Sequence, residues 1–175
     1  MGFMNAIKKF WKKQSNQSQQ FIKEMPILIE KARLPLSIEY KIHLTAKELT
    51  SNQDTINTIT SKIIENDPNK RKYAGKSAQE FKKSANKIFK YESYRTQNVK
   101  IVPSNADRLD IYIDDIFLGK LPIEYTKNTL SYLQSTIVAN FAYIKGGPYK
   151  YYNFESEQII KDYEPFDLSI YIQFS

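Results

Sequence analysis

The sequence predicts an α+β protein: a small, mostly antiparallel β-barrel with flanking helices and an N-terminal helical extension. Apolar and polar residues alternate in residues 38–44, 137–143 and 166–174, which is the period of half-buried strands. Isoleucines at positions 56, 59 and 63 recur at helical spacing instead. A hairpin pattern at Leu109–Pro122 completes the observations that favour this class.

The segment Leu109–Pro122 has the pattern of two short strands joined at residues 114–115, which are both aspartates. Ile111 and Ile113 lie on one face of the first strand at period two. Acidic residues tolerate the left-handed backbone of a tight hairpin, although Asp-Asp is a weaker turn signal than Asn-Gly. Gly119 within the second strand predicts a bulge or a close backbone approach.

Residues 38–44 form the first clear strand pattern, and His43, the only histidine, falls on its polar face. No second histidine and no cysteine lies near His43 in the sequence. We therefore expect His43 to be a solvated strand residue rather than a metal ligand or a catalytic base.

The C-terminal strands are separated by glycine and polar residues. Residues 146–148 (Gly-Gly-Pro) are expected to break the strand at 137–143, and tyrosines at 149–152 then lead into a polar loop that ends at Glu164. Residues 166–174 show the cleanest alternation in the chain, so their inward face is expected to be core.

Two helices are predicted before the hairpin. The first carries the isoleucine stripe, with Asp54 as its N-cap and residues 66–69 as its end. The second begins at the capping box Ser77–Glu80 and continues through Ile88 and Phe89, with lysines away from its apolar stripe. A further helix is expected at about residues 124–133, after the hairpin.

The basic charge is concentrated in the first part of the chain. Residues 1–102 carry 20 Lys and Arg against 9 Asp and Glu, a net charge of +11, whereas residues 103–175 carry 6 against 10, a net charge of −4. A basic half indicates a polyanionic partner such as nucleic acid or an anionic membrane surface. Solvated lysine faces are the alternative.

Residues 70–100 form the most basic tract and also contain aromatic residues. Tyr91, Tyr94 and Arg95 follow one another closely, and such residues can stack on bases and neutralise phosphates. Buried tyrosines at strand ends are the alternative interpretation. The lysines of the second helix belong to the same tract; they are Lys82, Lys83, Lys87 and Lys90.

The N-terminal part is divided from the rest by composition. Residues 3–13 combine apolar positions at helical spacing with four lysines, which indicates a partner-packed or frayed helix, or a helix on a membrane surface. We expect residues 1–35 to be this segment and its linker, 36–70 a strand-helix extension, and 71–175 the barrel domain. The absence of cysteine, of a signal-like apolar run and of a membrane span predicts a cytoplasmic protein.

No sequence motif indicates an enzyme or a cofactor. Phosphate loops, nucleophile elbows and zinc-protease motifs are missing, and thiol chemistry is excluded because there is no cysteine. Asp107, Asp110, Asp114 and Asp115 could hold a hard cation, but turn residues are the simpler account. A non-enzymatic binding module is therefore the expected class.

Residues 71–175 resemble the HIRAN domain, a small barrel related in shape to OB-folds. The resemblance rests chiefly on Leu118-Gly119-Lys120-Leu121-Pro122, which fits the end of the family's hairpin motif, and on the turn residues Pro103 and Asp107. The paired glycines 146–147 and the alternating last strand follow the family's order of elements, and Tyr73-Ala74-Gly75 is similar to its opening strand.

The resemblance implies a nucleic-acid-binding barrel, because HIRAN domains of DNA-repair proteins grip the 3′ end of single-stranded DNA and similar domains stand alone in bacteria. Of the family's end-binding residues only Asp107 is kept; Ser104 and Ala106 replace the motif's asparagine and aromatic residue. The residues expected to contact nucleic acid are Lys82, Lys83, Lys87, Lys90, Tyr91, Tyr94, Arg95, Asp107 and Lys120. A protein or membrane partner for residues 3–13 is the alternative function.

Overall fold

The predicted α+β class is confirmed, with mostly antiparallel sheets and few helices. The computed structural model describes residues 38–175 except 69–70, 85, 106 and 134–136. The helices are α2 (Ala46–Leu49), α3 (Gln53–Asn66), the 3₁₀ turn η1 (Lys72–Gly75), α4 (Ala78–Lys82) and α5 (Ile123–Tyr132). The strands are β1 (Tyr40–Thr45), β2 (Ile88–Phe89), β3 (Arg95–Thr96), β4 (Val99–Asn105), β5 (Arg108–Ile113), β6 (Ile116–Lys120), β7 (Ile137–Asn153) and β8 (Gln158–Phe174).

The strands form two separate sheets, so the predicted barrel is not observed. The larger sheet has the order β1-β8-β7-β2, with β3 also paired to β7, and the smaller sheet is the meander β4-β5-β6. Neither sheet closes on itself. The alternating sequence pattern predicts half-buried strands but does not specify closure, which depends on long-range pairing.

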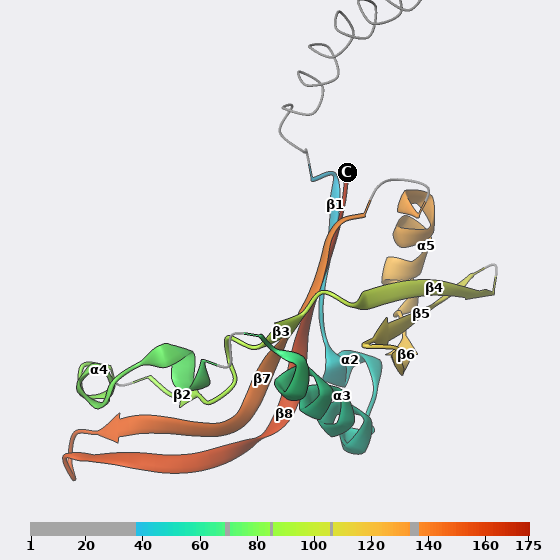
Figure 1. The fold of residues 1–175 in the computed structure, drawn as a ribbon. Helices are drawn as coiled ribbons and strands as arrows, with labels where there is room; N and C mark the ends of the chain where they lie inside the picture. Colours follow the sequence, from blue (N-terminus) through green and yellow to red (C-terminus); the bar gives the residue numbers. More distant parts are fainter. Residues whose placement is uncertain (1–37, 69–70, 85, 106, 134–136) are drawn as a thin grey trace, which may run out of the picture. The chain divides into compact units, whose positions relative to one another are not determined.

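The long hairpin of β7 and β8 forms the centre of the larger sheet. Both strands have 17 residues, and they curve together between the part beside β1 and the part beside β2 (Figure 1). The predicted break at the paired glycines is wrong: the ladder continues with a register shift between Lys145 and Gly147. Gly146 has φ +71°, and a Cβ there would lie 2.3 Å from the Pro165 carbonyl oxygen.

The polar loop expected before Glu164 is instead strand. Tyr149 pairs with Asp162 and Tyr151 with Ile160, and only residues 154–157 turn the chain. Apolar and polar residues do not alternate strictly in this part of the hairpin, where neighbouring Lys161 and Asp162 are both exposed and Tyr149 is buried. Its strand character therefore comes from long-range pairing rather than from a visible apolar period.

The inner face of the larger sheet packs against α3. The buried side chains on this face are Ile42, Leu44, Ala142, Ile144, Leu168, Ile170, Ile172 and Phe174. The predicted isoleucine stripe of α3 lies in the same core, and each of its three side chains is at most 1% exposed. The N-cap is Asn52 rather than Asp54, because the Asn52 side chain accepts hydrogen bonds from the amides of residues 54 and 55.

The hairpin of the smaller sheet confirms the turn prediction. Asp114 and Asp115 have φ values of +48° and +65°, so both central residues are left-handed as a type I′ turn requires. Gly119 is at both a bulge and a close approach: the β5–β6 register shifts beside it, and a Cβ would lie 2.3 Å from the Leu49 carbonyl oxygen. The helix expected after the hairpin is α5, with Pro122 as its N-cap.

The second predicted helix is much shorter than expected. Its capping box is present, because the Glu80 carboxylate accepts from the Ser77 amide and hydroxyl, but α4 ends at Lys82. Ile88 and Phe89 instead form β2, with Ile88 opposite Lys150 of β7. Tyr73 and Ala74, expected in a strand, lie in η1 with positive φ values.

Candidate functional site

The outer face of the larger sheet carries aromatic side chains. Side chains alternate across a strand, so the residues next to the buried isoleucines point away from the core. On the neighbouring strands β1, β8 and β7 these outward positions bring together four rings, of which three are half-buried and one, that of His43, is exposed. We call this set the outer aromatic face; its members are His43, Phe141, Tyr143 and Tyr171.

Three of these rings form a stack across the strands. The Tyr171 ring lies between His43, at a centroid distance of 4.3 Å, and Phe141, at 5.1 Å, with interplanar angles of 11° and 28°. Tyr143 meets Phe141 edge-on at 5.3 Å. These contacts fix the ring orientations and leave the ring edges and outer surfaces partly accessible.

His43 is exposed on the outward face of β1, and its ring has two neighbours there. Its Nε2 atom lies 2.8 Å from the Ser169 hydroxyl, and its ring is stacked on Tyr171. His43 is therefore an exposed member of the outer aromatic face, as predicted for a solvated strand residue, with its ring oriented by Ser169 and Tyr171.

Cations lie beside these rings. The Arg95 guanidinium donates to the Tyr143 hydroxyl at 3.3 Å, and Lys41 and Lys145 occupy exposed outward positions on β1 and β7. Asp167 of β8 pairs with Lys145 of β7 and places an acid beside that lysine. The Asp167 carboxylate accepts hydrogen bonds from the backbone amides of Lys47 and Leu168. The combination of aromatic rings and cations is suited to a planar, negatively charged ligand.

A pocket of about 500 Å³ opens beside the outer aromatic face. Tyr143 and Tyr171 line it from the sheet, and Phe89 lines it from β2. The other lining residues are His43, Glu92, Ile144, Lys145, Gly146, Glu164 and Ser169. The pocket therefore joins the rings of the sheet to the segment that carries β2.

An ion pair borders this pocket. The Lys87 ammonium lies 2.6 Å from a Glu164 carboxylate oxygen and 4.6 Å from the centroid of the Tyr149 ring. The hydrogen bond to Glu164, with one to Tyr149, raises the pKa of Lys87. Tyr149 also donates to Asp162 at 2.9 Å, and this hydrogen bond raises the pKa of the phenol. These contacts hold Glu164 at the pocket wall.

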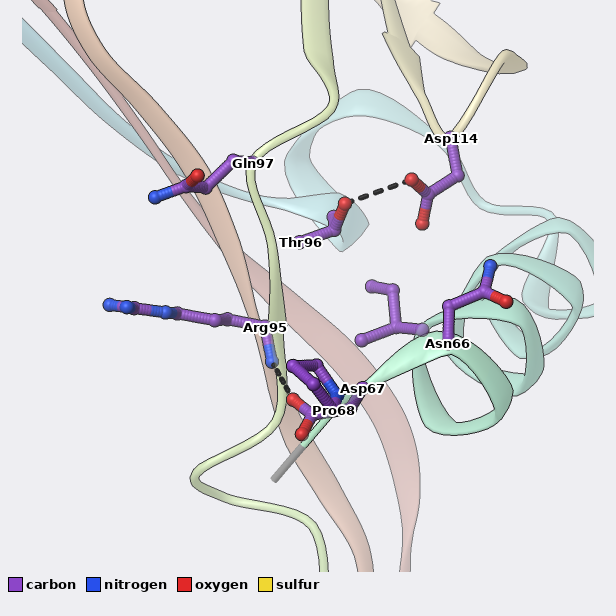
Figure 2. Close-up of a pocket in the computed structure, with 8 residues that line it drawn as sticks. Asn66, Asp67, Pro68, Arg95, Thr96, Gln97 and Asp114 are labelled. Carbon is purple, nitrogen blue, oxygen red and sulfur yellow. Dashed lines mark hydrogen bonds between the residues drawn. The ribbon is translucent and has the colours of Figure 1, made fainter. Parts of the chain in front are cut away.

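A second, smaller pocket of about 300 Å³ lies on the other side of β3. Figure 2 shows Arg95 and Gln97 on one side of the strand and Thr96 on the other, where its hydroxyl donates to Asp114 at 2.8 Å. Asp67 is 4% exposed and accepts from the Arg95 amide. The two buried acids of this pocket, Asp67 and Asp114, thus accept hydrogen bonds from residues of β3.

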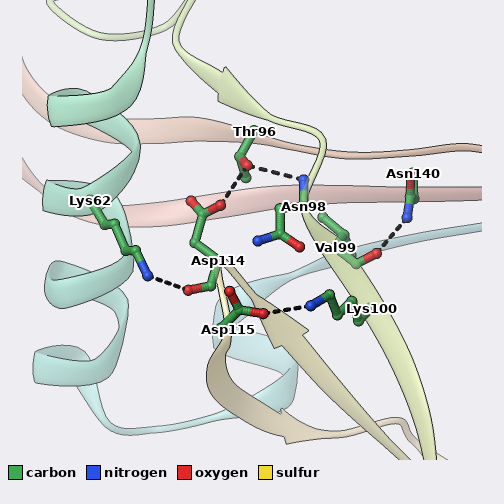
Figure 3. A network of polar contacts seen from close by, with 8 residues as sticks. All are labelled: Lys62, Thr96, Asn98, Val99, Lys100, Asp114, Asp115 and Asn140. Atoms are coloured by element: carbon green, nitrogen blue, oxygen red, sulfur yellow. Dashed lines mark hydrogen bonds and ion pairs between the residues drawn. The ribbon is translucent and has the colours of Figure 1, made fainter.

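The polar contacts around Asp114 join α3 to both sheets. Figure 3 shows Lys62 of α3 donating to the Asp114 carbonyl oxygen, and Asn140 of β7 donating to the Val99 carbonyl oxygen of β4. Lys100 pairs with Asp115, and this hydrogen bond lowers the pKa of the Asp115 carboxyl. The acidic residues of the hairpin are therefore turn and network residues in this structure.

Among the described residues, no group of three or more His, Asp or Glu side chains is arranged to hold a metal ion. Asp110 accepts from the Ser104 hydroxyl at 3.1 Å, and Asp114 and Asp115 have the partners given above. The four aspartates considered from the sequence thus do not converge on one point.

The predicted nucleic-acid residues are spread over several elements. Arg95 lies on the outer aromatic face, and Lys87 borders its pocket. Lys82 and Lys83 are exposed at the end of α4, and Lys90 lies over the Tyr91 ring at 5.0 Å.

Three other predicted residues are placed away from that face. Tyr94 is only 2% exposed, and burial raises the pKa of its hydroxyl, so its ring cannot stack on a base in this conformation. Asp107 lies in the turn before β5 beside α5 residues, and Lys120 lies opposite Asp110 at the end of β6. The predicted helical row of lysines does not exist, because α4 ends before Lys87.

Sequence reasoning missed most of the outer aromatic face. It assigned Phe141 and Tyr143 to the pattern of a half-buried strand, but Ala142 and Ile144 are the residues of that strand that face the core. The available signal was that both alternating sets of this strand are apolar. When both faces of a strand carry apolar residues, contact with water does not account for the apolar residues on the second face.

The predictions for residues 3–13 and for the N-terminal part up to residue 35 lie outside the described residues. Among the helices of the described part, none is both long enough and apolar enough to span a bilayer. No family model matches the chain, and no curated protein or solved structure similar to it was found.

Proposed function

We propose that this protein is a non-enzymatic module that binds single-stranded nucleic acid through the outer aromatic face. One observation supports this most strongly: the solvent side of the larger sheet presents four aromatic rings with Arg95, Lys41 and Lys145 beside them. An ordinary solvated sheet face would carry polar residues at these outward positions.

The physical basis is stacking combined with phosphate neutralisation. Bases of a single strand are not held in a duplex, so they can lie against half-buried rings, at a gain of about 1–3 kcal/mol per base. Arginine and lysine at the border of the rings would contact the phosphates between these bases, and such contacts release counterions. Lys87 adds a further cation on the far side of the pocket.

A HIRAN-like relationship and a preference for DNA are parts of this proposal. They rest on the motif Leu118–Pro122 and on Asp107. In the structure the motif glycine lies against the Leu49 backbone, which gives it a packing role independent of any ligand. The residues that we propose to bind nucleic acid are therefore those of the outer aromatic face and not those of the motif.

The test is fluorescence anisotropy with a labelled 12-nucleotide single strand and the matching duplex, at low and at moderate salt. We expect tighter binding of the single strand, with affinity that falls as salt rises. A double variant, Phe141→Ala with Tyr171→Ala, should lose most of this binding while circular dichroism still shows a folded protein.

The matched control is Phe117→Ala, because Phe117 is an aromatic residue that is 45% exposed on the other sheet. Its binding should equal that of the unaltered protein. If the folded protein binds neither nucleic acid at low salt, or if the double variant binds as well as the control, the proposed interface is wrong.

A further inference from the structure

We propose that the pocket beside the outer aromatic face accepts one base that carries an exocyclic amino group, such as cytosine or adenine. This inference rests on the proposed function and gives that interface a base preference. It depends on the pocket's shape and on the two carboxylates in its wall.

The shape suits a flat aromatic ligand. At about 500 Å³ the pocket falls within the size range of small-ligand sites. Tyr143 and Tyr171 line the pocket from the sheet and Phe89 lines it from β2, so a base in the pocket would have aromatic side chains from both elements beside it. Phe89 is itself positioned by Tyr149, at a ring distance of 5.3 Å.

The charge of the pocket wall determines which part of a nucleotide can enter. Glu92 and Glu164 line the pocket together with one cation, Lys145, and Arg95 lies on the outer aromatic face beside it. The charge of Glu164 is balanced by Lys87, so Glu92 is the carboxylate that would repel a phosphate, whereas Lys145 and Arg95 would attract the phosphate to the side of the sheet. The base is therefore the part that enters, and the phosphates stay on the side of the sheet.

Both carboxylates are held in place and keep acceptor capacity. One Glu92 oxygen accepts from the Phe89 amide at 3.2 Å, and one Glu164 oxygen is paired with Lys87. Within the described part of the chain, the second oxygen of each receives no hydrogen bond from another residue. An ionised carboxylate only accepts hydrogen bonds, so a ligand that meets these atoms must donate.

Bases differ in whether their exocyclic group donates or accepts a hydrogen bond. Cytosine presents an amino group where uracil presents a carbonyl oxygen, and adenine also carries an exocyclic amine. The amino group would donate to a carboxylate oxygen, whereas the carbonyl oxygen would be repelled by it. The pocket therefore favours cytosine over uracil although the two rings have nearly the same size.

The test compares fluorescein-labelled dC12 and dU12 in anisotropy titrations of the full chain at low salt. We expect dC12 to bind about fivefold more tightly, which is the lower end of the discrimination that a base-edge contact provides. The variant Glu92→Gln can still accept from the Phe89 amide but presents an amide NH₂ to the pocket. It should lose the preference for dC12 or reverse it.

Glu155→Gln is the matched control, because Glu155 is an exposed carboxylate in the turn between β7 and β8. It should keep the full ratio between the two oligonucleotides. Equal binding of dC12 and dU12 by the unaltered protein, or an unchanged ratio in Glu92→Gln, would overturn the base preference and leave the proposed function standing. Binding of neither oligonucleotide would overturn both.

Discussion

The two faces of the larger sheet are built from the same strands but have different chemistry. The inner face is mainly aliphatic, and residues such as Ile42, Ala142 and Ile170 are at most 1% exposed. The outer face alternates with it residue by residue and carries His43 and Tyr171 with partly accessible rings. We therefore expect substitutions on the inner face to lower stability and substitutions at neighbouring outward positions to weaken the proposed binding.

The largest expected effect is on the inner face. Ile170→Ala should lower the free energy of unfolding by about 2–5 kcal/mol, because it leaves a cavity in a fully buried site. Urea denaturation followed by circular dichroism measures this. Tyr171→Ala, one residue along, should cost clearly less because its ring is half-buried. Equal losses of stability would mean that the outer face is also part of the core.

The next effect is on the outer face. Tyr143→Ala should weaken binding of a 12-nucleotide single strand about 5- to 150-fold, the equivalent of one lost stacking contact. Tyr143→Phe keeps the ring but removes the hydroxyl that accepts from Arg95, so it should retain most of the affinity. Anisotropy titrations of both variants separate stacking from the hydrogen bond. A Phe variant as weak as the Ala variant would argue against stacking.

The smallest effect concerns the cations. Lys145→Gln should reduce the slope of log affinity against log salt by about 0.7, the contribution of one phosphate contact on a single strand. Lys161→Gln is the control, since Lys161 is exposed on the distant part of β8 that pairs with Lys150. Its slope should match that of the unaltered protein. A similar reduction in both variants would indicate diffuse charge attraction rather than a contact at Lys145.

The local features of the fold could be predicted from the sequence because nearby residues determine them. The left-handed turn at Asp114-Asp115, the capping box at Ser77 and the buried stripe of α3 each depend on residues within a few positions. Gly119 was also interpretable, because a glycine in a strand indicates a close approach or a bulge.

The long-range features could not be predicted in this way. Ile88 and Phe89 fit the apolar stripe of a helix, but pairing with residues 149–150 of β7, some sixty positions later, makes them a strand. Residues 158–164 were expected to be a polar loop because their apolar and polar residues do not alternate strictly, and their pairing with residues 147–153 of β7 makes them a strand. Two open sheets were formed where a barrel was expected, since alternation alone does not fix which edges meet.

The candidate site was missed for a related reason. Period two shows that a strand has two faces, but it does not say which is buried when both carry apolar residues. In β7 Phe141 and Tyr143 belong to one of the two alternating sets, and the structure places the other set, with Ala142 and Ile144, in the core. Of the predicted contacts, Arg95 lies on the outer aromatic face and Lys87 borders its pocket.

The central claim is that single-stranded nucleic acid contacts the outer aromatic face. Backbone amide chemical-shift mapping of the ¹⁵N-labelled full chain, titrated with dC12, tests it most directly. We expect the largest shifts in residues 41–43, 141–145 and 169–171 and at Arg95, with small shifts in β4–β6. Shifts concentrated in α4 or in the β4–β6 sheet, or no shifts from a folded protein at low salt, would contradict the claim.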